Sequence, residues 1–250
     1  MSKNNLGLFF QENAKRYANH IAIEFPNGDI KTYQQLNQIV NQTSRFLIES
    51  FKISNGDVVC ISGLKKIETF CMMLACLKIG AIYSVFDSHS PINRVLTIFS
   101  TCQPKLIAAE AGFIGLIQKK SEVKKISFLE NNFIEKELVK RFGSENFSDV
   151  GSVNINNPAY IMFTSGSTGI PKGAVISHAN LISFISWSKK EYGFSTNDKL
   201  TNVNPLFFDN SVFDFYSSIF SGACLVPFSK NEVSNPALLN PAHVVRRLSY

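Results

Sequence analysis

The sequence lacks the repeats and the compositional bias of fibrous and disordered proteins. Its 250 residues contain no Gly-X-Y period and no low-complexity tract. Hydrophobic residues make up 45% of the chain and charged residues 18%, so the chain can bury a sizeable core. Since a domain usually takes roughly 100–200 residues, the length allows one large domain or two smaller ones.

A long uninterrupted apolar run is also missing. The most apolar stretch extends from Phe70 to Phe86 and contains Lys78 and Gly80, whereas a membrane-spanning helix needs about 20 predominantly apolar residues. A buried helix followed by a buried strand is the better interpretation. The residues from Met1 to Asn5 contain no apolar core of the kind found in signal peptides. We therefore expect no membrane partner.

Cysteine is scarce, and its spacing excludes the usual scaffolds. The five cysteines are odd in number and form no CxxC pair, which argues against a disulfide framework or a zinc site. Reduced thiols are typical of cytoplasmic proteins, so we expect a cytoplasmic location. His20, His89 and His243 have no cysteine or acidic partner at the spacing of metal ligands, so they indicate no metal site.

The positive charge is mild and dispersed. The formal net charge is +6, but the lysine pairs are spread along the chain with acidic residues between them, and aromatic residues do not alternate with them. This pattern excludes a basic stripe for nucleic acid and favours a solvated surface with a bias toward small anionic ligands.

Strand and helix patterns alternate along the first part of the chain. Short β-rich apolar runs predict strands at 21–25, 58–62, 81–86 and 106–109. Between them, apolar residues at helical spacing predict helices that begin after Thr32, near Ile67 and at Ser90-Pro91. Units of this length predict an α/β fold with layered sheets of largely parallel strands and flanking helices.

The pattern weakens between Gly112 and Asn157, and Asn156-Asn157-Pro158 is the clearest boundary signal. We expect a first α/β subdomain at 1–157 and the start of a second at 158–250. In the second, the pattern predicts a strand at 159–163, a polar loop at 164–173, an apolar run at 174–176 and a helix from about Ala179 to Lys190.

The polar loop carries the strongest chemical signal. Its ten residues include three glycines, four hydroxyl side chains and Lys172. Glycines let successive backbone N–H groups converge on an anion, and the hydroxyls and the lysine add donors, as a polyphosphate site requires. The alternative is a flexible surface turn. The loop matches neither the Walker A pattern nor GxGxxG, and the chain contains no Gly-x-Ser-x-Gly of an α/β-hydrolase.

The order of residues in this loop resembles a known signature. Phe163 to Gly173 is similar to Tyr-Thr-Ser-Gly-Ser-Thr-Gly-x-Pro-Lys-Gly of the adenylate-forming (AMP-binding) enzymes, with Phe163 in place of the common Tyr. His178 lies where that family has a downstream His. The resemblance implies a nucleotide-binding role for the following residues: Thr164, Ser165, Gly166, Ser167, Thr168, Gly169 and Lys172. It implies a catalytic role for Lys172, which would move as the loop closes.

Other matches to this family cover most of the chain and are mainly architectural. Thr32 to Leu36 resembles its Thr-Tyr-x-x-Leu helix start, and Leu77 to Ala81 resembles its Leu-Lys-Ala-Gly-Ala junction. Asp87, Pro91 and Arg94 fit its Asp-Pro-x-x-Pro-x-x-Arg pattern, with Ser88 in place of the first Pro. We interpret these as packing and turn residues.

A second chemical motif lies at Phe208 to Phe213. It resembles the Phe-Asp-x-Ser of amino-acid-activating members, and this implies that Asp209 holds the α-ammonium group of the substrate. Because aromatic neighbours make an unpaired carboxylate costly to bury, a substrate cation would suit Asp209. The alternative is that Asp209 caps a helix from Ser211. The expected substrate-binding residues are Phe208, Asp209, Asn210 and Phe213. Asp214 matches no role, and we expect it at the surface.

The resemblance therefore implies an amino-acid adenylation domain of the nonribosomal peptide synthetase or D-alanine–carrier protein ligase type. It implies ATP and Mg²⁺, and transfer of the acyl group to the phosphopantetheine thiol of a carrier protein. Two alternatives stay open: half of an acyl- or aryl-CoA ligase, and a non-catalytic nucleotide-binding module.

The later motifs of the family are missing from these 250 residues. The sequence is thus expected to be the N-terminal half of such an enzyme and to be inactive by itself. Its last residues predict a helix with one apolar face, formed by Leu238, Leu239, Val245 and Leu248.

Overall fold

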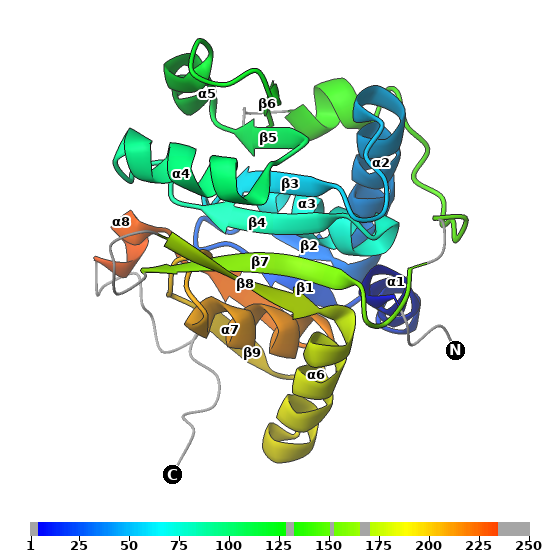
Figure 1. The fold of residues 1–250 in the computed structure, drawn as a ribbon. Coiled ribbons are helices and arrows are strands. Elements are labelled where there is room, and N and C mark those ends of the chain that lie inside the picture. Colours follow the sequence, from blue (N-terminus) through cyan, green and yellow to red (C-terminus); the bar gives the residue numbers. More distant parts are fainter. Residues whose placement is uncertain (1–4, 129–132, 151–152, 166–170, 235–250) are drawn as a thin grey trace.

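The computed structural model describes residues 5–128, 133–150, 153–165 and 171–234 (Figure 1). The apolar face predicted at Leu238–Leu248 lies outside these ranges. The described strands form two sheets flanked by helices, with the strand orders β6-β5-β3-β4-β7-β8 and β2-β1-β10-β9. The expected α/β fold with largely parallel sheets is confirmed.

The larger sheet is parallel except at one edge. Its strands are β3 (Val58–Ser62), β4 (Ile82–Phe86), β5 (Leu106–Ala109), β6 (Lys124–Ser127), β7 (Pro158–Ser165) and β8 (Pro171–Ser177). Strands β3 to β7 run parallel to their neighbours, and β8 returns antiparallel to β7. The carboxyl ends of β4 and β7 therefore lie at the same edge.

Helices cover both faces of this sheet. On one face, α4 (Ile92–Cys102) and α5 (Ala111–Ile117) pack their apolar side chains on Cys60, Phe86 and Ile107. On the other face, α2 (Tyr33–Phe51), α3 (Ile67–Ile79) and α7 (Asn210–Ile219) belong to a second, larger core that also contains Val59 and Ile61. Adjacent residues of β3 thus face opposite cores, as the pleat of a strand requires.

The smaller sheet joins distant parts of the chain. It consists of β1 (Ile21–Glu24), β2 (Ile30–Thr32), β9 (Lys199–Asn202) and β10 (Cys224–Pro227), and β1 pairs in parallel with β10 through Ile23 and Leu225. In the larger sheet β7 pairs with β4 through Tyr160 and Tyr83. Both sheets therefore contain strands from either side of Asn157-Pro158.

Four further helices complete the described elements. They are α1 (Leu6–Arg16), the short η1 (Ile134–Leu138), α6 (His178–Tyr192) and α8 (Lys230–Val233). The expected cap of α2 is present, because the Thr32 hydroxyl accepts from Gln35 N–H and the Gln35 side chain accepts from Thr32 N–H. Within the described ranges, no helix combines the length and the apolar character needed to cross a bilayer.

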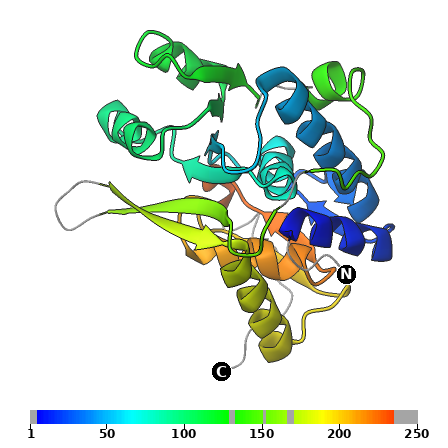
Figure 2. The ribbon, with the colours of Figure 1, turned by 45° about the vertical axis from the view of Figure 1, so that its right-hand side comes forward.

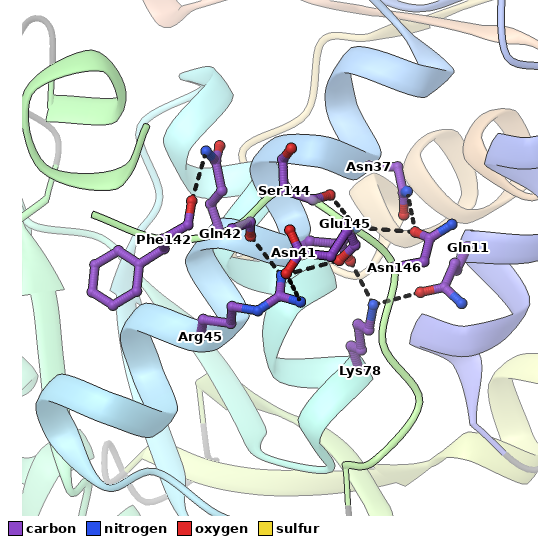
Figure 3. Close-up of polar contacts among 11 residues, drawn as sticks. Gln11, Asn37, Asn41, Gln42, Arg45, Lys78, Phe142, Ser144, Glu145 and Asn146 are labelled. Atoms are coloured by element: carbon purple, nitrogen blue, oxygen red, sulfur yellow. Dashed lines mark hydrogen bonds and ion pairs between the residues drawn. The ribbon is translucent and has the colours of Figure 1, made fainter. Parts of the chain in front are cut away.

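A buried polar cluster holds the segment after η1 against α2. Lys78 is fully buried, and its ammonium group donates to the side-chain oxygens of Gln11 and Asn41 (Figure 3). Asn41 in turn donates to the backbone oxygen of Ser144 at 2.9 Å, and Arg45 forms a 3.0 Å ion pair with Glu145. Side chains of α1, α2 and α3 thereby fasten a stretch of chain that has no regular structure of its own.

Candidate active site

The predicted phosphate segment forms an antiparallel hairpin rather than a simple loop. Strand β7 continues to Ser165 and β8 begins at Pro171, so much of the segment expected as a loop at 164–173 is extended and paired. Figure 2 shows the two strands running out from the body of the molecule. Residues Gly166, Ser167, Thr168 and Gly169, which we expect to bind phosphate, lie outside the described residues.

Thr164 and Lys172 are placed directly opposite each other in this hairpin. Residues that face each other in an antiparallel pair project to the same side of the sheet. Both residues are exposed, and the Thr164 hydroxyl lies 3.5 Å from the backbone oxygen of Lys172. A hydroxyl and an ammonium group thus share one side of the β7–β8 pair, next to its last described pair, Ser165 and Pro171.

Packing explains why Gly173 follows Lys172. Gly173 pairs with Phe163, and a Cβ at Gly173 would lie 3.2 Å from the Phe163 ring and 3.0 Å from the Ile161 side chain. The Phe163 ring packs on the core beneath α4. Gly173 therefore allows the hairpin to close over an aromatic ring, a structural role separate from phosphate binding.

A cavity of about 460 Å³ opens beyond the carboxyl ends of β4 and β7. It brings together Thr164 of the hairpin and Asp209 of the second motif, which are far apart in the sequence. Its other polar or charged side chains are Asp87, Ser90 and Arg94, and Phe208 also lines it. Ligands of open α/β sheets bind at this edge of the strands, so this cavity is the candidate active site.

Asp209 lies at the start of α7 and points its carboxylate at its neighbour. The carboxylate accepts from the Asn210 N–H at 2.9 Å, so Asp209 does act as a helix cap. The argument from the cost of burying this carboxylate among aromatic residues does not apply here, because Asp209 is exposed. The carboxylate still acts on its surroundings: burial and the Asp209 charge together raise the pKa of Tyr160 to about 12.

The other residues of the second motif lie in different surroundings. Phe208 is exposed and lines the cavity, and Asn210 is exposed in the first turn of α7. Phe213 instead packs among aromatic rings between α6 and α7, with its centroid 5.2 Å from that of Tyr192 and 6.1 Å from that of Phe184. The structure does not bring Phe213 into the 460 Å³ cavity.

Asp214 is not at the surface as expected. Its side chain is largely buried and accepts from the Asn202 amide at 3.1 Å. Burial raises the pKa of Asp214 to about 6, with Asn202 and the nearby Lys65 opposing the change. Burial also lowers the pKa of Lys65 to about 8, and its ammonium group donates to the Asn202 backbone oxygen at 2.7 Å. The sequence motif at the start of α7 gave no indication that Asp214, Asn202 and Lys65 lie together.

His178 is the first residue of α6, directly after β8, and it has a structural role. It is fully buried, its Nδ1 accepts from the Leu6 N–H at 3.2 Å, and burial lowers its pKa to about 4. A neutral imidazole thus joins the start of α6 to the start of α1.

Two further cavity residues, Asp87 and Arg94, came from a motif that we interpreted as architectural. Asp87 does form a turn, because its carboxylate accepts from the His89 N–H at 3.0 Å and from the Ser90 hydroxyl at 3.1 Å. Among the described residues, no three His, Cys, Asp or Glu side chains lie close enough together to hold a metal ion.

Known proteins resemble this chain in sequence. The sequence model described as "AMP-binding enzyme" matches residues 10–248. The chain is 30% identical over 217 residues to Bacitracin synthase 3 of Bacillus licheniformis, a match that covers 87% of this chain and 3% of that protein. It is 28% identical over 223 residues to the L-proline--[L-prolyl-carrier protein] ligase of Pseudomonas fluorescens, covering 86% of this chain and 43% of that protein. The chain thus spans less than half the length of either relative.

Solved structures share the fold. The Klebsiella oxytoca NpsA N-terminal subdomain, in complex with 3-hydroxyanthranilyl-AMSN, superimposes with a TM-score of 0.75 at 22% identity, covering 90% of this chain and 53% of that one. ATP-bound MatB from Rhodopseudomonas palustris gives a TM-score of 0.76 at 19% identity, covering 92% and 47%.

Proposed function

This chain belongs to the AMP-binding enzyme family, and from this premise we propose that it supplies the ATP- and substrate-binding part of a ligase that activates an amino acid. The observation that supports the proposal best is the shared cavity. Thr164 of the phosphate hairpin and Asp209 of the amino-acid motif line one space at the carboxyl ends of β4 and β7. A candidate group for binding ATP and a candidate group for binding the amino acid therefore line the same cavity.

In the proposed reaction, an oxygen of the substrate carboxylate attacks the α-phosphorus of ATP. The bond from the α-phosphorus to the oxygen that bridges it to the β-phosphorus breaks, and pyrophosphate leaves. Catalysis of this kind depends mainly on position and on stabilising charge. The Thr164 hydroxyl and the Lys172 ammonium group, on one side of the hairpin, would hold the phosphates. Asp209 would pair with the α-ammonium group and so orient the carboxylate.

Mg²⁺ fits this proposal as an ion that ATP carries on its phosphates, since Mg²⁺ commonly binds through substrate phosphates and few protein ligands. Its role would be to offset the charge of the departing pyrophosphate. Within the described ranges, the acidic side chains of the cavity are Asp87 and Asp209, so the described part of the cavity offers few metal ligands of its own.

The acceptor in the proposal is the phosphopantetheine thiol of a carrier protein. Support comes from the relatives, one of which is named as a ligase for a prolyl-carrier protein. The free cysteines of the chain suit the reducing cytoplasm, where ATP and such thiols are found.

Calorimetric titration of the 250-residue chain tests the proposal. We expect Mg-ATP to bind, and at least one amino acid of a panel to bind in its presence. Asp209→Asn should abolish amino-acid binding and leave ATP binding unchanged. Asp149→Asn, the same change at an exposed position outside the cavity, is the matched control and should alter neither. Absence of ATP binding by the wild-type chain would refute the proposal.

An acyl- or aryl-CoA ligase is the second candidate. The Asp209 carboxylate already accepts the Asn210 N–H, as a helix cap would in an enzyme whose substrate has no ammonium group. In that case aryl or fatty acids would bind in the same titration, and Asp209→Asn would not affect them.

A further inference from the structure

Arg94 is the one cation on the described wall of the candidate active site. Starting from the proposed function, we infer that Arg94 binds the pyrophosphate portion of ATP, its β- and γ-phosphates, in the cavity that Thr164 also lines. The inference gives a ligand-binding role to a residue whose motif we interpreted as architectural.

The fold carries Arg94 to the cavity on a rigid support. It lies in the first turn of α4, directly before the fully buried Val95. The same helix buries Phe99 edge-on against Phe86, with ring centroids 5.1 Å apart. Phe163, which precedes Thr164, packs on this same core. Arg94 and Thr164 are therefore held at the cavity by neighbouring residues of one packed cluster.

The guanidinium group of Arg94 has no partner in the described part of the chain. It makes no hydrogen bond or ion pair there, although its side chain is only partly exposed. Arg45 and Arg141, in contrast, pair with Glu145 and Glu137 at 3.0 Å. A partly buried cation without a counter-charge is unfavourable, so the position is suited to an anionic ligand.

The acidic side chain of the cavity wall that belongs to the same motif as Arg94 is already engaged. The Asp87 carboxylate accepts from the His89 N–H and the Ser90 hydroxyl, and it lies beyond ion-pair distance of Arg94. The free fork of N–H donors on Arg94 matches two oxygens of one phosphate, a geometry that lysine cannot provide.

The phosphate portion of ATP is the anion that best fits this place. Thr164 and Arg94 line the same cavity, and Lys172 projects from the same side of the hairpin as Thr164. A substrate carboxylate would instead be drawn toward Asp209 through its own ammonium group. Arg94 is thus a binding and positioning residue that would stabilise the negative charge that develops on the departing pyrophosphate.

Binding of three probes to the 250-residue chain tests this inference: Mg-ATP, inorganic pyrophosphate with Mg²⁺, and AMP. We expect Arg94→Gln to weaken pyrophosphate and ATP binding about tenfold to a hundredfold and to leave AMP binding unchanged. Arg94→Lys keeps the charge without the fork and should give an intermediate loss. Arg141→Gln removes an exposed arginine outside the cavity and should bind all three probes as the wild type does.

The outcomes separate this inference from the proposed function. If Arg94→Gln and Arg94→Lys both bind pyrophosphate as the wild type does, the inference is wrong and the proposed function stands. An equal loss for AMP would also overturn it, because Arg94 would then act on the whole site. If the wild-type chain binds neither ATP nor pyrophosphate, both proposals fail. Thermal unfolding of each variant, compared with the wild type, shows whether a loss comes from misfolding.

Discussion

The ammonium group of Lys78 lies 4.2 Å from the centre of the Phe147 ring. The two residues belong to α3 and to the irregular segment after η1, and the contact closes a cluster in which Lys78 also donates to Gln11 at 2.6 Å. A fully buried lysine is thus bonded to amide oxygens and an aromatic face. Burial, followed by the nearby positive charge of Arg45, lowers the pKa of Lys78 to about 7.

This lowered pKa predicts a stability that rises with pH. Between pH 7 and 10.5 the unfolded chain holds a proton on Lys78 that the folded chain has lost, so the free energy of unfolding should increase across this window. Below pH 7 both states are protonated and the cost of burying the cation is fully present. Urea unfolding at pH 7, 8 and 9 measures the slope. Lys78→Met should flatten it, whereas Lys120→Met, at an exposed lysine, should not.

Gly7 should tolerate no larger side chain. A Cβ at Gly7 would lie 2.2 Å from the Lys78 Cα, so α1 and α3 approach each other too closely for any substitution. We expect Gly7→Ala to destabilise the fold by about 2–4 kcal/mol. In α5, a Cβ at Gly115 would meet nothing within 4 Å, so Gly115→Ala should be neutral or slightly stabilising. Chemical denaturation compares the two variants, and equal stabilities would contradict the packing of α1 on α3.

Cys102 should be the most reactive thiol among the described cysteines. It is partly exposed, and its hydrogen bond with Cys60, whose sulfur is 3.5 Å away, lowers its pKa. Burial raises the pKa of Cys60, Cys71, Cys76 and Cys224. Because the thiolate is the nucleophile, iodoacetamide should modify Cys102 first. Peptide mass spectrometry after brief labelling identifies the site. Cys102→Ser should remove the fast phase and Cys71→Ser should leave it.

Lys172 should matter for nucleotide binding and little for folding. Its side chain is exposed, opposite Thr164 at the end of the hairpin, so its loss leaves no buried group unpaired. If the proposed function holds, Lys172→Gln should weaken ATP binding about tenfold without changing the melting temperature. Lys190→Gln, at an exposed position on α6, is the control. A fall in melting temperature of Lys172→Gln alone would point to a structural role.

Local patterns were sufficient to predict several regular elements of the first half of the chain, but not all of them. The strands at 58–62 and 106–109 and the cap at Thr32 agree with the structure residue by residue, because each has a clear apolar period between turn residues. The helix Leu6–Arg16 and the strand Ile30–Thr32 were missed. The first has its large apolar residues gathered at its start, and the second is short and half exposed.

The site was harder to predict than its motifs. Gly173 is a poor strand residue by composition, and Gly173 and Ser165 are extended because they pair with the opposite strand. The exposure of Asp209 and the burial of Asp214 depend on which elements pack against α7, information that no local window contains. The two motifs assigned Thr164 and Asp209 to one function. That Arg94 lines the same cavity is evident only from the fold.

The parallel pairing of β1 with β10 has a consequence for biosynthesis. Ile23 leaves the ribosome long before Leu225, its register partner, has been translated. Until then, the edge of β1 that faces β10 presents bare backbone amides and carbonyls, which other nascent chains can pair with. We expect the smaller sheet to be the last part to assemble, with β1 paired meanwhile only along its other edge, in the hairpin with β2.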